Sequence, residues 1–195
     1  MKIIAFTGAL ESGKSTAALG AVSRILNMGK GKKEVVACVA FADPMKHICE
    51  EYFGFEEENL YTPDGKRKIN PVWNITGREF LQKFGQGMRD IIDPNFWVKL
   101  MEIKIENLSK DEENNYAAIL IDDLRMVNEA EMVHKHGGIV IHVERPEHNP
   151  VFKGIENHPS EVKLPASLID YMIVNDGTVD DLYKKVNSII DQIFC

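Results

Sequence analysis

The chain has 195 residues, of which 44% are hydrophobic and 27% charged, and this size fits one α/β domain with room for a lid or an insertion. Its net charge of −7 argues against nonspecific binding to polymeric nucleic acid or to membrane surfaces. The first residues form a predicted strand rather than a signal peptide, no apolar run reaches transmembrane length, and the three cysteines lack metal-ligand spacing. These features predict a cytoplasmic protein that must concentrate positive charge locally to bind an anion.

A strand is predicted over residues 2–7 and a helix over residues 15–26. The segment between them, GALESGKS, fits the phosphate-loop pattern G-x-x-x-x-G-K-S/T. Its glycines let backbone N–H groups point at a phosphate, and the helix N-terminus adds a favourable dipole. Lys14 can reach the β- and γ-phosphates of a nucleoside triphosphate, and Ser15 can ligate Mg²⁺. A chance glycine turn is the alternative, which the strand before the motif disfavours. The predicted nucleotide-binding residues of this loop are Gly8, Glu11, Ser12, Gly13, Lys14, Ser15 and Thr16.

A second buried strand is predicted over residues 35–41, and Pro44 suits the first turn of the helix that follows. Residues 54–74 are polar and rich in turn formers, with the clearest turn signal in the sequence TPDG. We interpret residues 54–74 as a mobile excursion from the core on the substrate side.

Thr76 and Glu79 have the spacing of a capping box and predict the start of another helix. Asp93 is predicted as the N-cap of the next helix and Pro94 as its first residue. Residues 145–165 are polar and proline-rich, and we interpret them as a lid-like loop. The remaining predicted strands and helices alternate over residues 117–121, 128–136, 139–143, 168–174 and 179–193.

This alternation of strands and helices predicts the fold class. It is typical of a parallel sheet with helices on both faces. Together with a phosphate loop after the first strand, it predicts an α/β protein with the P-loop NTPase fold. We expect residues 1–195 to form a single domain whose five-stranded parallel sheet has the strand order 2-3-1-4-5.

Asp122 stands at the end of a predicted apolar strand, where a carboxylate can hold Mg²⁺ or its bound water. The alternative for Asp122 is a turn or N-cap role. Arg125 follows closely and can bind a phosphate with its guanidinium fork, or it can form a salt bridge with Asp123 or Glu129.

The chain has only six arginines, and further ones fall in positions that suit a site. Arg78 and Gln82 are four residues apart on one helix and share a face, and Arg89 lies roughly over the same face. This face suits a second phosphorylated ligand, although a solvated surface is the alternative. Arg145 begins the lid-like loop, where it can clamp a transferring phosphoryl group or simply lie on the surface.

Several segments, taken in order, resemble the bacteriophage deoxynucleoside monophosphate kinases, which belong to the wider nucleoside monophosphate kinase group. The resemblance covers most of the chain, and the segments after the phosphate loop are the more specific ones. These segments are FADPMK at 41–46, TGREFLQKFG at 76–85, RD at 89–90, DPNFW at 93–97, DDLRMVNEA at 122–130 and HPSE at 158–161.

The resemblance implies ATP- and Mg²⁺-dependent phosphorylation of a deoxynucleoside 5′-monophosphate to the diphosphate, which feeds viral DNA synthesis. By this analogy Lys14, Arg125 and Arg145 are catalytic, and Ser15 and Asp122 hold the metal. The loop of Asn175, Asp176 and Gly177 lies near the adenine of ATP. The residues that bind the acceptor nucleotide are Phe41, Asp43, Lys46, Arg78, Gln82, Arg89, Trp97, Asp123 and Arg125. The family is also compatible with a homodimer.

Two other functions remain open from the sequence. A P-loop kinase for another small acceptor, such as dephospho-coenzyme A, shares the phosphate loop and a lid, but the DPNFW and DDLR segments favour the nucleotide kinase. A nucleotide-hydrolysing switch protein would need a water-positioning residue and switch loops, and we identify neither in the sequence.

Overall fold

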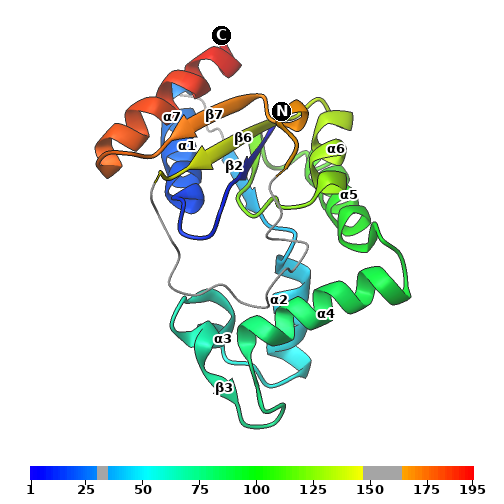
Figure 1. Ribbon diagram of the computed structural model, residues 1–195. Coiled ribbons are helices and arrows are strands. Elements are labelled where there is room, and N and C mark those ends of the chain that lie inside the picture. Colours follow the sequence, from blue (N-terminus) through cyan, green and yellow to red (C-terminus); the bar gives the residue numbers. More distant parts are fainter. Residues whose placement is uncertain (30–34, 147–163) are drawn as a thin grey trace.

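The computed structural model describes residues 1–29, 35–146 and 164–195. A five-stranded parallel sheet in the order β2-β5-β1-β6-β7 forms its centre (Figure 1). Ile4 of the central strand lies opposite Leu120 on one side and Ile139 on the other. The strands are β1 (Lys2–Thr7), β2 (Val35–Val39), β5 (Tyr116–Ile121), β6 (Ile139–Glu144) and β7 (Tyr171–Val174). The sheet therefore confirms the predicted strand order 2-3-1-4-5.

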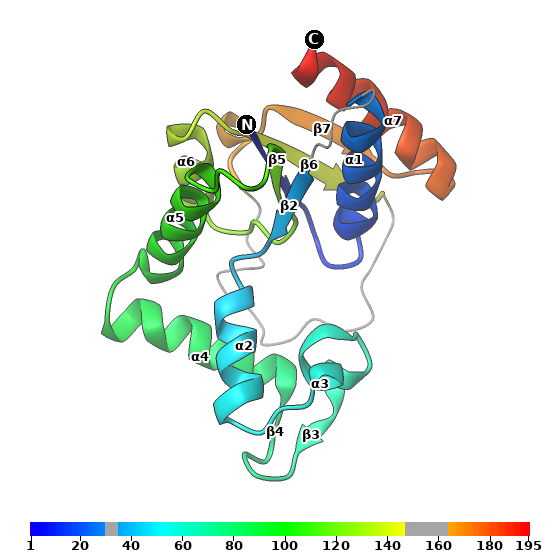
Figure 2. The ribbon, with the colours of Figure 1, turned by 180° about the vertical axis from the view of Figure 1, so that it is seen from behind.

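Helices cover both faces of the sheet, as the near-continuous apolar strands require (Figure 2). On one face, Ile4 and Phe6 pack against α1 (Lys14–Met28) and α7 (Val179–Phe194). On the other face, Ile3 and Ala5 pack against α5 (Phe96–Ser109) and α6 (Val127–Lys135). The side chains of β1 alternate between the two cores because successive strand residues point to opposite faces.

A second group of elements lies beyond the sheet, at the bottom of Figure 1. It consists of α2 (Asp43–Tyr52), α3 (Glu57–Tyr61), a 3-10 turn η1 (Gly65–Arg67), β3 (Ile69–Asn70), β4 (Ile75–Thr76) and α4 (Gly77–Ile91). Cys49, Phe55, Leu60 and Leu81 form its own small core. The segment 54–74, which we predicted from its polarity as an excursion, thus contains a short helix, the η1 turn and one strand of a two-stranded antiparallel ladder.

One predicted helix start is confirmed and another is wrong. The Oγ1 atom of Thr76 accepts a hydrogen bond from the Glu79 backbone N–H, and Glu79 accepts one from the Thr76 N–H, so the capping box opens α4. In contrast, α5 begins at Phe96 rather than at Pro94. The Asp93 carboxylate accepts a hydrogen bond from the Asn95 N–H at 2.7 Å and forms a turn before the helix, which delays its start.

Two other predictions concern the lid-like loop 145–165 and membrane-spanning segments. Most of the predicted lid-like loop 145–165, including the HPSE segment, lies outside the described residues. No helix within the described ranges is both long enough and apolar enough to cross a membrane.

Candidate active site

The phosphate loop connects β1 to α1 and is held tightly by the neighbouring strands. Gly8 and Gly13 have φ angles of 144° and 100°, which residues other than glycine rarely adopt. A Cβ atom on Gly8 would lie 2.1 Å from the Val143 carbonyl oxygen, and one on Gly13 would lie 2.5 Å from Nδ2 of Asn175. That same Nδ2 donates a hydrogen bond to the Ser12 carbonyl at 2.9 Å. Asn175, which follows the edge strand β7, therefore links the phosphate loop to the end of that strand.

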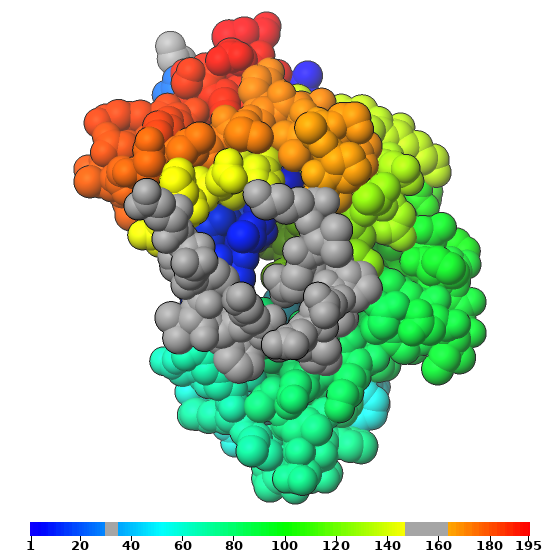
Figure 3. Space-filling model, in the orientation of Figure 1, coloured from blue at the N-terminus to red at the C-terminus, as the bar shows by residue number. Residues whose placement is uncertain are grey.

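Side chains of the loop present groups that suit a polyphosphate. The Lys14 ammonium is turned back into the loop and donates hydrogen bonds to the carbonyls of Gly8, at 2.8 Å, and Ala9, at 2.6 Å. Within the described residues, the buried Ser12 hydroxyl has no hydrogen-bond partner. Ser15 is exposed at the start of α1, next to the half-buried Thr16. In the space-filling view, blue atoms of the N-terminal segment are visible between the sheet and the α2–α4 group (Figure 3).

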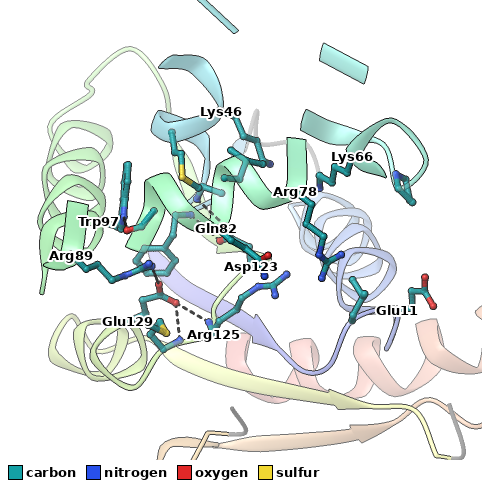
Figure 4. A pocket seen from close by; sticks show the side chains of 18 of the residues that line it. Glu11, Lys46, Lys66, Arg78, Gln82, Arg89, Trp97, Asp123, Arg125 and Glu129 are labelled. Atoms are coloured by element: carbon teal, nitrogen blue, oxygen red, sulfur yellow. Dashed lines mark hydrogen bonds and ion pairs between the residues drawn. The ribbon is translucent and has the colours of Figure 1, made fainter. Parts of the chain in front are cut away.

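A pocket of about 280 Å³ lies beside this loop (Figure 4). Glu11, Phe41 and Asp123, which line it, each follow the carboxyl end of a strand, where parallel sheets bind their ligands. Helices α2, α4 and α5 supply half of the remaining lining residues. Eight of the predicted acceptor-binding residues line this pocket: Phe41, Lys46, Arg78, Gln82, Arg89, Trp97, Asp123 and Arg125. The ninth, Asp43, is not among the lining residues, and its carboxylate accepts a hydrogen bond from the Ala40 N–H at 2.8 Å.

One end of the pocket is strongly cationic. Lys46, Arg78 and Arg125 from three different parts of the chain approach Lys66 of η1, and together with partial burial they lower the pKa of the Lys66 ammonium to about 8. Burial is the largest cause of this shift, and Asp123 opposes it. In Figure 4, Lys66 and Arg78 lie on the same side of the pocket as Glu11 of the phosphate loop.

Trp97 lies toward the opposite end of the pocket, on the same side as Arg89 and Glu129 (Figure 4). The buried indole Nε1 donates a hydrogen bond to the Gly85 carbonyl at 2.9 Å, which fixes the ring. The ring also makes an edge contact with Phe84, with centroids 6.1 Å apart. A Cβ atom on Gly85 would lie 3.3 Å from the Met45 sulfur, so the absence of a side chain lets Met45 approach the helix closely.

Two carboxylates hold the walls of the pocket in place. Asp123 accepts hydrogen bonds from the Phe41 N–H at 2.8 Å and the Ala42 N–H at 3.0 Å, which ties the end of β5 to the start of α2. Glu129, only 3% exposed, accepts hydrogen bonds from the backbone N–H groups of Arg125 at 2.8 Å and Met126 at 3.0 Å. Burial raises the pKa of both carboxyls, that of Glu129 to about 7.

The sequence analysis missed some lining residues. Lys66 and Arg67 come from the segment interpreted only as an excursion, although the run Lys66-Arg67-Lys68 is a recognisable basic signal in an acidic chain. The sequence presents Glu129 as one alternative salt-bridge partner of Arg125, and in the structure its carboxylate accepts a hydrogen bond from the Arg125 backbone N–H.

Four other predicted residues lie outside the pocket lining. Asp122 is half-buried directly after β5, and Arg145 is exposed directly after β6. Asp176 forms an ion pair with Lys185 of α7 at 2.6 Å, and Gly177 lies beside Asp181 of the same helix. The roles of these residues remain predictions.

Comparisons with known proteins found a matching family and several similar chains. A family model described as deoxynucleotide monophosphate kinase matches residues 32–186. A protein of Acanthamoeba polyphaga mimivirus, provisionally named a deoxynucleotide monophosphate kinase, is 30% identical over 98% of this chain and 97% of its own length. The deoxynucleotide monophosphate kinase of Escherichia phage RB69 is 30% identical over 63% of this chain and 47% of its own length. Among solved structures, the chain is similar to the Mycobacterium tuberculosis APS kinase in complex with AMPPNP and APS, with 11% identity, a TM-score of 0.49 and 97% of both chains covered.

The family match decides between the three functions that the sequence left open. It covers the DPNFW and DDLR segments, which favour the nucleotide kinase over a dephospho-coenzyme A kinase. The chain belongs to the deoxynucleotide monophosphate kinase family and is a kinase, an enzyme that transfers a phosphoryl group to a deoxynucleoside monophosphate.

Proposed function

We propose that the phosphoryl donor of this kinase is ATP and that the acceptor deoxynucleoside 5′-monophosphate binds in the pocket beside the phosphate loop. The observation that carries the proposal is the convergence of eight predicted acceptor-binding residues, from five separate segments, on one pocket of about 280 Å³. These residues belong to the segments that resemble the phage kinases, and those segments lie far apart in the sequence. Their convergence beside the phosphate loop is what a reaction between two nucleotides requires.

The charge distribution supports one orientation of the acceptor. Arg78 and Arg125 line the end of the pocket that also contains Glu11 of the phosphate loop, and they suit the acceptor phosphate. Trp97 and Gln82 lie toward the other end, and they suit the base. This orientation directs the acceptor phosphate toward the donor.

On the donor side, the proposal assigns the phosphates of ATP to the loop. The close-packed glycines and the orphaned Ser12 hydroxyl fit a polyphosphate wrapped by backbone N–H groups. The Lys14 ammonium, now on the loop carbonyls, would exchange these partners for phosphate oxygens. Asn175, Asp176 and Gly177 would border the adenine, which the contact of Asn175 with the loop supports.

Magnesium fits the donor side by its chemistry. The Ser15 hydroxyl and the Asp122 carboxylate are oxygen ligands, which Mg²⁺ prefers, and each follows one of the adjacent strands β1 and β5 in the chain. When bound, the ion would neutralise charge on the donor phosphates. Both residues would hold it directly or through water.

The chemical step needs no covalent intermediate. An oxygen of the acceptor phosphate attacks the γ-phosphorus of ATP in line, the bond from that phosphorus to the bridging oxygen breaks, and ADP leaves. Lys14 and Arg125 would compensate the charge of the transferring group, and we also assign this role to Arg145. Its position directly after β6, a neighbour of β1 in the sheet, supports that assignment.

The viral relatives support a place for this reaction in the host cytoplasm, where it would supply precursors for DNA synthesis. We treat residues 1–195 as one kinase domain in which segment 54–74 serves the acceptor side. The presence of Lys66 and Arg67 in the pocket lining supports that role for the segment.

The test is a transfer assay with ATP, Mg²⁺ and each nucleoside and deoxynucleoside monophosphate in turn, in which ADP and the new diphosphate are both measured. Equal amounts of the two products, lost in Lys14→Ala and on chelation of Mg²⁺, are expected. ATP binding without transfer to any monophosphate would overturn the proposal.

A further inference from the structure

The turn η1 holds Lys66 in a defined position at the edge of the pocket. The Gly65 N–H donates a hydrogen bond to Thr62 Oγ1 at 2.9 Å, and Lys66 donates its backbone N–H to the Thr62 carbonyl at 3.0 Å. A Cβ atom on Gly65 would lie 2.0 Å from the Glu58 carbonyl oxygen, so the turn packs directly on α3. This packing directs Lys66 toward the pocket (Figure 4).

Lys66 differs from its two basic neighbours. Arg67 lies 3.7 Å from Asp64, and Lys68 forms an ion pair with Glu58 at 2.9 Å. No hydrogen bond or ion pair joins the Lys66 ammonium to any of the residues that the structure describes. Lys66 is nevertheless half-buried and next to the charges of Lys46, Arg78 and Arg125.

The protonated Lys66 ammonium is in an unfavourable environment in the free protein. Partial burial and three nearby cations all disfavour a protonated amine, and the Asp123 carboxylate counteracts them in part. A dianionic phosphate in the same place reverses the balance, because it attracts every one of these cations at once. Within the part of the chain that the structure describes, the Lys66 ammonium is therefore left among cations without an ion-pair partner, and a bound phosphate would supply one.

We infer that Lys66 binds the 5′-phosphate of the acceptor nucleotide, so that segment 54–74 contributes a direct ligand of the substrate. This inference rests on the proposed function, because it takes the acceptor to occupy this pocket. It extends that function by one substrate-binding residue that is not among the acceptor-binding residues predicted from the sequence. Acceptor binding then also joins η1 to Arg78 of α4 and Arg125 after β5 through one shared phosphate.

Acceptor binding through Lys66 should depend on pH. The groups that line the pocket near Lys66 are Glu11, Lys46, Arg67, Arg78, Asp123 and Arg125. The arginines stay charged, and a nucleotide phosphate is already a dianion above about pH 7, because its second pKa is about 6. Loss of the Lys66 proton, whose pKa is about 8, therefore weakens acceptor binding as the pH rises beyond that value.

The test compares Lys66→Met and Lys66→Arg with Lys68→Met, a matched removal of an exposed lysine from the same turn. In Lys66→Met we expect the KM of the acceptor to rise roughly 10- to 100-fold with unchanged kcat, because a charged contact is lost. The KM of ATP is expected to stay at its wild-type value. Lys68→Met should keep wild-type constants throughout.

The pH profile separates a binding role from a structural one. Wild-type acceptor KM should rise between about pH 8 and pH 9.5, and Lys66→Arg should restore a low KM and flatten this rise, because arginine does not titrate there. The melting temperature of free Lys66→Met should equal or exceed that of the wild type, since an unfavourable charge is removed. If Lys66→Met folds poorly, the profile of Lys66→Arg still decides.

The outcomes distinguish the inference from the function on which it rests. A wild-type acceptor KM in Lys66→Met, or an unchanged pH rise in Lys66→Arg, would overturn the role of Lys66 and leave the kinase assignment intact. A wild-type protein that transfers to no monophosphate would overturn the proposed function itself.

Discussion

The carboxylate of Glu129 lies 3.6 Å from the guanidinium of Arg89, and both side chains are largely buried. The other oxygen of Glu129 accepts hydrogen bonds from the backbone of Arg125 and Met126 at the start of α6. One side chain thus positions two arginines of the pocket, Arg89 through its charge and Arg125 through its backbone. Glu129 acts through these residues and is a positioning residue.

Replacement of Glu129 by glutamine should weaken acceptor binding more than it weakens folding. The amide oxygen can still accept from the two backbone N–H groups, but above about pH 7, where the Glu129 carboxylate is ionised, the charge that holds Arg89 is lost. We expect the acceptor KM to rise about 5- to 20-fold, which corresponds to roughly 1–2 kcal/mol for a buried charged contact. Steady-state kinetics with Glu129→Ala as the more disruptive reference measures this, and an unchanged KM in Glu129→Gln would contradict the positioning role.

Glu129 should also make the stability of the protein depend on pH. Its pKa is raised from 4.5 to about 7, mainly by burial, so the folded state holds a proton that the unfolded state has released. The stabilisation is fully present below about pH 4.5 and is lost as the pH rises through about 7. Urea unfolding of wild type and Glu129→Gln across this range checks it. The wild type should lose stability relative to the variant as the pH rises, and a constant difference between the two would count against the raised pKa.

Substitutions of Asn175 and Gly13 should affect ATP binding and stability to different extents. Asn175→Ala releases the Ser12 carbonyl, so we expect a higher KM for ATP, an unchanged acceptor KM and a stability loss of about 1 kcal/mol. Gly13→Ala meets both a contact of 2.5 Å and a φ of 100°, and should cost about 1–3 kcal/mol.

The double variant is informative because it removes the contact but keeps the backbone strain. We expect its melting temperature to stay at or below that of Gly13→Ala. A melting temperature as high as that of Asn175→Ala would show that the contact with Asn175 alone explains why position 13 requires glycine.

Trp97→Phe should separate the hydrogen bond of the indole from its aromatic surface. The Gly85 carbonyl loses its buried indole donor, which should cost about 1–3 kcal/mol of unfolding free energy. The phenyl ring keeps contacts with Phe84 and Phe96, so the acceptor KM should rise less than in Trp97→Ala. Thermal unfolding and steady-state kinetics measure the two effects, and equal KM values in the two variants would argue against an aromatic wall for the base.

The parts that the sequence predicted well are those governed by local rules. The parallel sheet follows from apolar strands that alternate with helices, and the start of α4 follows from the reciprocal bonds of Thr76 and Glu79. Arg78 and Gln82 share a helical face and do meet in one pocket. Local rules failed at α5, because the carboxylate of Asp93 bonds to the Asn95 backbone before the helix begins.

The parts that could not be predicted depend on contacts between distant segments. Lys66 lies in a turn without periodicity, and its direction is set by the packing of Gly65 on α3. Glu129 reads as an ordinary helix residue, and only the position of Arg89 on α4 shows that its charge is used in the pocket. The role of Asp123 also depends on a distant segment, because its carboxylate accepts hydrogen bonds from the backbone of Phe41 and Ala42 between β2 and α2.

The central claim is that the pocket beside the phosphate loop binds the acceptor, and the kinetics of Arg78→Met test it most directly. We expect the KM of the acceptor to rise at least about tenfold, because the lost contact is charged, while the KM of ATP stays within about twofold of the wild type. Unchanged acceptor binding in this variant, or an equal rise of both constants, would contradict the claim.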